Sequence, residues 1–215
     1  MSAAPELPGV RRVARLSRRA LNQALAQRDW RGADAPAIDL RADAYGHGAA
    51  AIEAAARAHG ASRFTRDGDA PPAEAPSRVI YGFDGGHEPL MTLEGEVIAV
   101  KRVPASTPVS YGYTYVTAHE STLALIALGY ADGVPRSASN RASVRIGNAR
   151  GVIAGRIAMD QLVVDLAHST AAVGDPAVLW NDSGSLAAWC TATGRTADQL
   201  TARLGSRVAR IWSDE

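Results

Sequence analysis

The sequence contains a single lysine and a single cysteine. Lys101 is the one lysine among 23 basic residues, so an aldehyde cofactor could form an imine only there or at the N-terminal amine. Cys190 is the one cysteine, which excludes an internal disulfide and is typical of a reducing compartment. No uncharged apolar run is long enough to cross a bilayer, and the first residues contain no apolar signal segment. We therefore expect a cytoplasmic protein that is not bound to a membrane.

The overall composition sets broad limits on function. A chain of 215 residues with 47% hydrophobic residues can form one large or two small globular domains. The net charge of +1 gives no general reason to expect a nucleic acid or a membrane as partner. Arginines gather in the first 31 residues, but aromatic residues do not alternate with them, so we interpret this segment as a solvated helix face. The five histidines lie far apart, without metal-ligand spacing, and predict no metal site.

The first part of the sequence predicts two helices and two strands. Apolar residues recur at helical spacing in residues 13–28, whereas residues 36–42 alternate as in a strand. Residues 48–59 predict an alanine-rich helix that ends at Gly60. Proline and small polar residues then predict a linker at about 67–77, and residues 78–83 predict a short strand.

From about residue 90 the pattern changes to closely spaced strands separated by glycine, proline and asparagine turns. The expected strands are residues 96–103, 108–116, 121–129, 142–147, 151–158, 161–166 and 177–180. They predict an all-β domain, either a small barrel or a sandwich. Two short helices at about 185–192 and 197–204 follow. We expect Thr196 and Gln199 to form a capping box, Gly205 to end the second helix, and residues 207–212 to return as a strand.

A strand that leads into a glycine-containing turn stands at residues 38–48, IDLRADAYGHG. Such a turn before a helix can hold an anion, because the first amides of the helix have no partner within it. Tyr45, Gly46, His47 and Gly48 are therefore candidate phosphate-binding residues. On local sequence alone, a tight strand-to-helix turn without a ligand explains these residues better.

Three further motifs change that interpretation. They are VKRVPASTPVSYGYTY at 100–115, LGYADGVPR at 128–136 and GRIAMDQLVVDL at 155–166. Together with residues 38–48 they resemble the alanine racemase family, in order and in spacing. VARLSRRALN at 13–22 also resembles the family's first strand and helix. The resemblance implies an α+β protein with an all-β domain like the alanine racemase C-terminal domain at residues 89–215. It also implies that residues 1–88 are a short βα remnant of the family's pyridoxal-phosphate TIM barrel.

The resemblance also assigns positions to candidate site residues. Tyr130 matches the catalytic tyrosine base of the family, which serves the active site of the neighbouring subunit. Met159 and Asp160 match a segment that positions the substrate carboxylate. Tyr45 matches a tyrosine that contacts the cofactor phosphate. Each residue also has a purely structural interpretation, so equivalent position does not establish equivalent chemistry.

The sequence departs from the family at several of its functional positions. Arg41 stands where the family has its Schiff-base lysine, and a guanidinium stays protonated and is not competent for that role. Ala75 stands where an arginine normally meets the pyridine nitrogen, with Arg78 nearby, and Asp198 replaces a second active-site tyrosine. A TIM barrel takes roughly 250 residues, whereas little more than residues 13–88 are available here.

These observations favour a non-catalytic alanine-racemase-like protein with a binding or assembly role. We expect no cofactor, or at most weak non-covalent binding of pyridoxal phosphate. The partner is expected to be a second copy of the chain or a full-length racemase, since open barrel edges invite pairing. One alternative is an active pyridoxal-phosphate-dependent amino-acid racemase of D-alanine and cell-wall metabolism, which would use Tyr130 with cofactor held non-covalently or at Lys101. Another is binding of a nucleotide or sugar phosphate at Tyr45–Gly48, and the last is a decaying gene product without a role.

Overall fold

The computed structural model describes residues 9–32, 34–70 and 77–214, which form two compact units. The first unit combines residues up to Val13 with Glu94–Leu179, and the second combines Ala14–Leu93 with the segment from Trp180 to the C-terminus. The expected boundary at residues 88 and 89 divides the chain differently, because residues 180–215 pack with the N-terminal part. The expected linker at 67–77 lies mostly outside the described residues, and so does Ala75.

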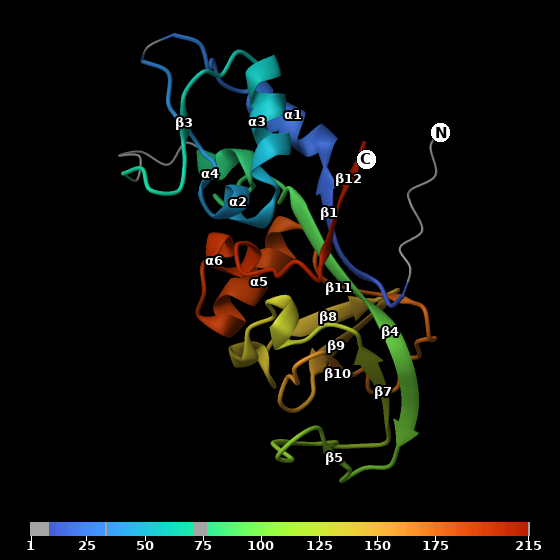
Figure 1. Cartoon of the computed structure of the whole chain (residues 1–215). Coiled ribbons are helices and arrows are strands. Elements are labelled where there is room, and N and C mark those ends of the chain that lie inside the picture. Colours follow the sequence, from blue (N-terminus) through green and yellow to red (C-terminus); the bar gives the residue numbers. More distant parts are fainter. Residues whose placement is uncertain (1–8, 33, 71–76, 215) are drawn as a thin grey trace. The chain divides into compact units, whose positions relative to one another are not determined.

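The first unit is a closed antiparallel β-barrel (Figure 1). Its strands lie in the order β11-β8-β9-β10-β7-β4, and pairing of β11 with β4 closes the ring. The strands are β4 (Met91–Val103), β7 (Ser121–Ile126), β8 (Ser143–Ile146), β9 (Ala149–Ile153), β10 (Leu162–Asp165) and β11 (Pro176–Trp180). Alternate residues such as Ala124, Ile126, Val144, Ile153 and Val164 are at most 1% exposed and fill the interior. The predicted all-β domain is therefore confirmed as a barrel.

Shorter elements join these strands. The expected strand at 108–116 is two short strands, β5 (Pro108–Val109) and β6 (Tyr115–Val116), which pair as an antiparallel hairpin. Two 3-10 turns, η1 (Tyr130–Asp132) and η2 (Arg136–Ala138), follow β7. Buried Asp132 accepts a hydrogen bond from the Gly129 amide at 2.8 Å and lies 3.4 Å from the Arg12 guanidinium, so its charge is compensated.

The second unit is mixed α/β. Its N-terminal elements are β1 (Arg12–Ser17), α1 (Arg18–Ala26), β2 (Ile38–Asp39), α2 (Arg41–Gly46), α3 (Ala49–Ala58), β3 (Phe64–Thr65) and α4 (Ser77–Ile80). The C-terminal elements are α5 (Ser183–Thr193), α6 (Ala197–Thr201) and β12 (Ala209–Ser213). β2 and β3 pair in parallel, and β1 is the neighbour of β12 in sheet order. A core that includes Leu25, Ile38, Ile52 and Tyr81 holds these elements together.

Hydrophobic periodicity and turn signals misplaced three element boundaries in this unit. Residues 12–17 form a strand, and the helix begins only after Ser17, whose Oγ accepts a hydrogen bond from the Ala20 amide at 3.1 Å. The strand expected at 36–42 is two residues long because Arg41 already begins a tight turn. α6 ends at Thr201, before Gly205, although Gln199 accepts a hydrogen bond from the Thr196 amide as the capping box predicts.

Residues 78–83 form the end of a helix, where we predicted a strand. The Phe83 amide donates to Arg78 O at 2.9 Å and the Gly82 amide donates to Val79 O at 3.1 Å, while Gly82 has φ +69°. This is the glycine-terminated helix end known as the Schellman motif. A short buried apolar run does not distinguish helix from strand, and Gly82 was the available signal of a helix end.

The helices of the structure are short. Among the described residues, none is long and apolar enough to span a bilayer.

Gly46 is required by close packing as well as by its backbone angles. It has φ +79°, and a Cβ there would collide with the Thr201 carbonyl oxygen. We expect Gly46→Ala to lower the free energy of unfolding by about 2–4 kcal/mol, which combines the left-handed conformation with overpacking. Urea denaturation followed by circular dichroism measures this loss. Gly68→Ala is the matched control, because Gly68 has φ +93° and open space around its Cβ position. An equal loss in both variants would contradict the role of Thr201.

Candidate functional site

The turn after β2 is left-handed over four consecutive residues. Ala42, Asp43, Ala44 and Tyr45 have φ between +51° and +54°. L-residues pay roughly 1–2 kcal/mol each in this conformation, so tertiary bonds must offset the cost. The Asp67 carboxylate accepts from the Ala42 amide at 2.9 Å. The Asp43 carboxylate accepts from the Ala49 amide at 2.8 Å.

The turn brings Arg41 and Tyr45 to the carboxylate of Asp39, and we call these three residues the Asp39 cluster. Arg41 donates to Asp39 through its amide at 3.1 Å, through Nε at 2.8 Å and through Nη2 at 2.6 Å. The Tyr45 hydroxyl donates to Asp39 Oδ2 at 2.5 Å. The Asp39 side chain is only 3% exposed, whereas that of Arg41 is 29% exposed. The carboxylate thus has four donors within the chain.

Protonation in the Asp39 cluster follows from these bonds. Burial by itself raises the pKa of Asp39, but the hydrogen bonds from Arg41 and Tyr45 outweigh it and lower the pKa below its usual value. The hydrogen bond to Asp39 raises the pKa of Arg41 further. Burial and the bond to Asp39 raise the pKa of Tyr45 to about 12. At neutral pH the cluster is therefore a carboxylate, a guanidinium and a neutral phenol.

His47 is completely buried beneath this turn. Its Nδ1 lies 2.9 Å from the Ala44 carbonyl oxygen, which makes Nδ1 the donor, and its ring contacts those of Tyr81 and Phe83 at 5.0 and 5.8 Å. Burial lowers the pKa of His47 to about 4, only partly opposed by the carbonyls of Ala44 and Tyr45. His47 is therefore a neutral core residue at physiological pH.

The candidate phosphate cradle at Tyr45–Gly48 is occupied by groups of the chain itself. The Tyr45 hydroxyl is bonded to Asp39, and the amide of Ala49, at the start of α3, is bonded to Asp43. The Gly46 carbonyl oxygen accepts from Arg210 Nε at 3.1 Å. Asp39 was not among the predicted site residues, although an acidic residue within an apolar strand, two positions before Arg41, was a visible signal.

Tyr130, Met159 and Asp160 lie together in the first unit. The Tyr130 amide donates to Ala158 O at 3.0 Å and the Ala131 amide donates to Met159 O at 2.9 Å, which joins η1 to the 158–160 segment. Tyr130 is 45% exposed and Met159 53% exposed. The Arg136 guanidinium lies 5.6 Å from the centre of the Tyr130 ring, a contact that sequence analysis missed. The motif thus forms one exposed surface.

Three other residues from the sequence analysis have separate surroundings. Lys101 is exposed on β4, opposite Leu123 in the register with β7. In the second unit, the Arg78 guanidinium lies 3.6 Å from the Asp198 carboxylate.

Among the described residues, no group of three or more histidine, cysteine, aspartate or glutamate side chains is placed to bind a metal ion.

The buried His47 predicts a specific pH dependence of stability. Its pKa is about 4 in the folded protein and about 6.5 in an unfolded chain. Because the unfolded chain binds the additional proton, the free energy of unfolding falls as the pH decreases from about 6.5 towards 4. Between pH 7 and pH 5 we expect a loss of about 2 kcal/mol, measured by urea denaturation at each pH. His47→Gln should remove this loss, whereas the control His59→Gln, at a less buried position, should retain it. An unchanged pH dependence in His47→Gln would disprove the assignment.

Comparison with known proteins supports this arrangement of motifs. The family model for the alanine racemase C-terminal domain matches residues 90–212, more than half of the chain. The alanine racemase of Salinispora arenicola is 43% identical over 151 residues, which are 65% of this chain and 41% of that protein. The chain spans about two fifths of the length of such curated relatives.

Solved structures agree with the family match. The alanine racemase from a D-cycloserine-producing Streptomyces lavendulae aligns with a TM-score of 0.62 and 33% identity, over 80% of this chain and 50% of that one. The alanine racemase from Streptomyces coelicolor aligns with a TM-score of 0.79 over 95% of this chain and 98% of that one, and its 22% identity supports the fold alone. With its C-terminal domain matched by sequence and by structure, the chain belongs to the alanine racemase family.

Proposed function

We propose that this chain is a non-catalytic member of the alanine racemase family that acts by binding and assembly. The observation that carries the proposal is the Asp39 cluster. Arg41 stands at the Schiff-base position, and its guanidinium is held by two hydrogen bonds to Asp39 at 2.6 and 2.8 Å. A guanidinium offers no neutral amine at working pH, and this one is further stabilised in its charged form.

The residues present do not fit pyridoxal phosphate. A cofactor phosphate at the turn needs free donors, whereas the Tyr45 hydroxyl and the Ala49 amide already donate to Asp39 and Asp43. Displacing the Asp39 carboxylate would break its hydrogen bonds with Arg41 and Tyr45, so a phosphate competes poorly for this position. The buried carboxylate also repels a second anion at the same place. We infer that the Asp39 carboxylate takes the place that a bound anion would have at this turn.

The strands of the second unit support the same conclusion. A TIM barrel has eight parallel strands and takes roughly 250 residues. Among the described residues of the second unit, the strands β2 and β3 pair in parallel, and each is two residues long. An enclosing barrel that excludes water from a cofactor cannot be built from these elements.

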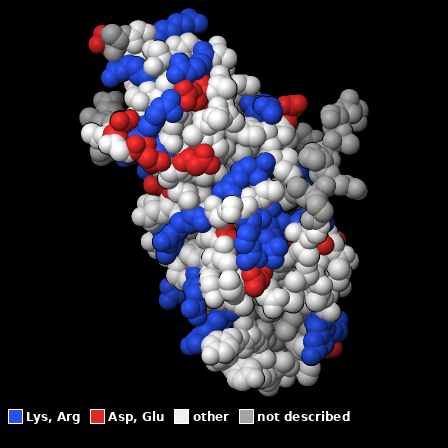
Figure 2. Space-filling view, viewed as in Figure 1, with Lys and Arg blue, Asp and Glu red and all other residues white. Residues whose placement is uncertain are grey.

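An assembly role is supported by the exposed apolar residues of the first unit. Tyr111 is 75%, Tyr113 70%, Val116 53%, Tyr130 45% and Met159 53% exposed. We call these five residues the tyrosine surface. Tyrosine and methionine are enriched at protein interfaces, where they bury large areas. In Figure 2 the part of the first unit around β5 shows mainly uncharged atoms. We infer that the tyrosine surface contacts a second copy of the chain, in keeping with the role that the family gives to Tyr130 in a neighbouring subunit.

The first test addresses the cofactor. After incubation with pyridoxal phosphate and reduction with borohydride, intact mass spectrometry should detect no stoichiometric adduct. Arg41→Lys should give the same result, because Asp39 would hold the new ammonium and Tyr45 as it holds the present groups. Lys101→Arg is the control, because any adduct that disappears in this variant was formed at the exposed Lys101. A stoichiometric adduct at Lys101 with racemisation of L-alanine, or one at position 41 in Arg41→Lys, would overturn the proposal.

The second test addresses assembly. Analytical ultracentrifugation of the native protein should show a dimer. The double variant Tyr111→Ser/Tyr113→Ser should sediment as a monomer, because it removes the two most exposed aromatic side chains of the tyrosine surface. Val173→Ser is the matched control, since Val173 is 64% exposed in the same unit but outside that surface. A native monomer would refute the homodimer. Co-elution of that monomer with a full-length alanine racemase would then identify the alternative partner.

A further inference from the structure

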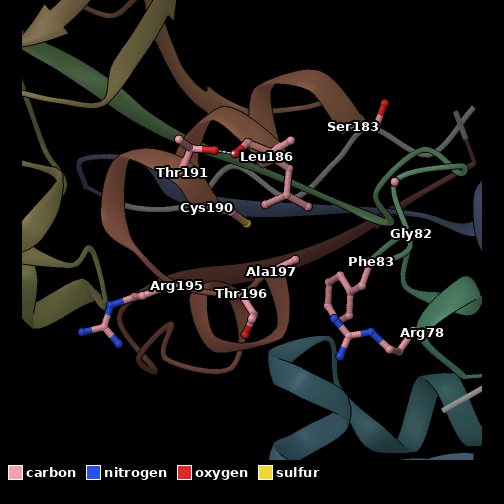
Figure 3. Close-up of a pocket in the computed structure, with 12 residues that line it drawn as sticks. Arg78, Gly82, Phe83, Ser183, Leu186, Cys190, Thr191, Arg195, Thr196 and Ala197 are labelled. Atoms are coloured by element: carbon pink, nitrogen blue, oxygen red, sulfur yellow. Dashed lines mark hydrogen bonds between the residues drawn. The ribbon is translucent and has the colours of Figure 1, made fainter. Parts of the chain in front are cut away.

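The second unit contains a pocket of about 390 Å³ that no part of the proposed function uses. Its walls are α5, α6 and the segment from α4 to Gly85. Figure 3 shows Leu186 and the Cys190 sulfur pointing from α5 towards Ala197, with the Phe83 ring facing this space from the opposite side. A pocket of this volume lies within the range of sites for small molecules.

The lining of this pocket combines apolar surface with positive charge. Leu186, Ala187, Ala197 and Phe83 provide the apolar part, and none of the lining residues is acidic. Two are arginines, but only Arg78 extends beside the Phe83 ring, whereas Arg195 points away from the pocket (Figure 3). The pocket therefore presents one guanidinium beside a flat apolar wall.

The guanidinium of Arg78 retains capacity to bind an anion. Its Nη2 is 3.6 Å from Asp198 Oδ1, which is an ion pair without a hydrogen bond. Asp198 Oδ1 is itself buried and has no hydrogen-bond partner among the described residues. The pair is thus loose, whereas a carboxylate that approaches a guanidinium freely makes two parallel hydrogen bonds. Asp198 therefore attracts the Arg78 guanidinium but makes no hydrogen bond to it, so a ligand carboxylate could still bind there.

From this geometry we propose that the pocket binds a small carboxylate with a flat apolar body. The carboxylate pairs with Arg78, and the apolar body packs between Phe83, Leu186 and Ala197. Because Asp198 competes with the ligand for the same guanidinium, removing the charge of Asp198 strengthens binding. This outcome separates the proposal from simple apolar binding, which Asp198 would not affect.

The single cysteine provides the measurement. Cys190 lines the pocket, and burial raises the pKa of its thiol, so iodoacetamide alkylates it slowly and a bound ligand slows it further. The probes are 3-phenylpropionate and its neutral counterpart 3-phenylpropionamide, tested on the full chain. We expect saturating 3-phenylpropionate to slow alkylation at least several-fold, and the amide to bind about ten-fold more weakly.

Three variants complete the test. Arg78→Gln should weaken 3-phenylpropionate binding about ten-fold, and Asp198→Asn should strengthen it several-fold. Arg66→Gln is the matched control, because Arg66 is an arginine of the same unit that pairs with Glu53 outside the pocket. Equal protection by both probes, or by neither, would overturn the proposal. If Arg78→Gln fails to fold, Asp198→Asn decides alone, and unchanged or weaker binding in that variant contradicts the proposal.

Discussion

The ion pair between Asp39 and Arg41 is the interaction on which the turn of the second unit depends. A carboxylate that is 3% exposed is tolerated only because a guanidinium, an amide and a phenol donate to it. The Tyr45 hydroxyl bonds to Asp39 on β2, and this bond helps to offset the conformational cost of the left-handed backbone at Ala42–Tyr45. The turn therefore holds an internal anion, the carboxylate of Asp39.

The two units differ in how they satisfy their backbone. In the first, pairing of β11 with β4 closes the barrel, so the ladder of these strands has no open edge. This rigid scaffold presents Tyr111, Tyr113 and Tyr130 outward, which suits a binding surface. The second unit pairs much of its backbone within helices and the short strands β2 and β3, and side chains supply further bonds. Arg210 alone donates to the carbonyl oxygens of Gly46, Leu204, Gly205 and Val208, and thereby joins the turn to the C-terminal segment.

Sequence patterns predicted the barrel strands better than the elements of the second unit. Strands such as Ser121–Ile126 alternate between an interior and an outer face, and this alternation is visible in the sequence. From their periodicity, residues 13–17 were predicted as helix and residues 78–83 as strand, and both predictions were wrong. Each segment is short, so its apolar residues do not distinguish a helix from a strand. There, local caps at Ser17 and Gly82 decided the structure. The tight turn at Arg41, in contrast, depends also on Asp67, which bonds to the Ala42 amide from 25 residues away.

The sequence by itself determined which side chains of this protein are able to form a covalent bond with a ligand. A single lysine, a single cysteine and an arginine at position 41 restrict the possible chemistry in any fold, because nucleophilicity and permanent charge are properties of the side chains themselves. Tertiary structure alone decided that His47 is uncharged and that Arg78 lines a pocket at 3.6 Å from the Asp198 carboxylate. These properties depend on burial and on which groups meet across the chain, and electrostatic free energies change with both.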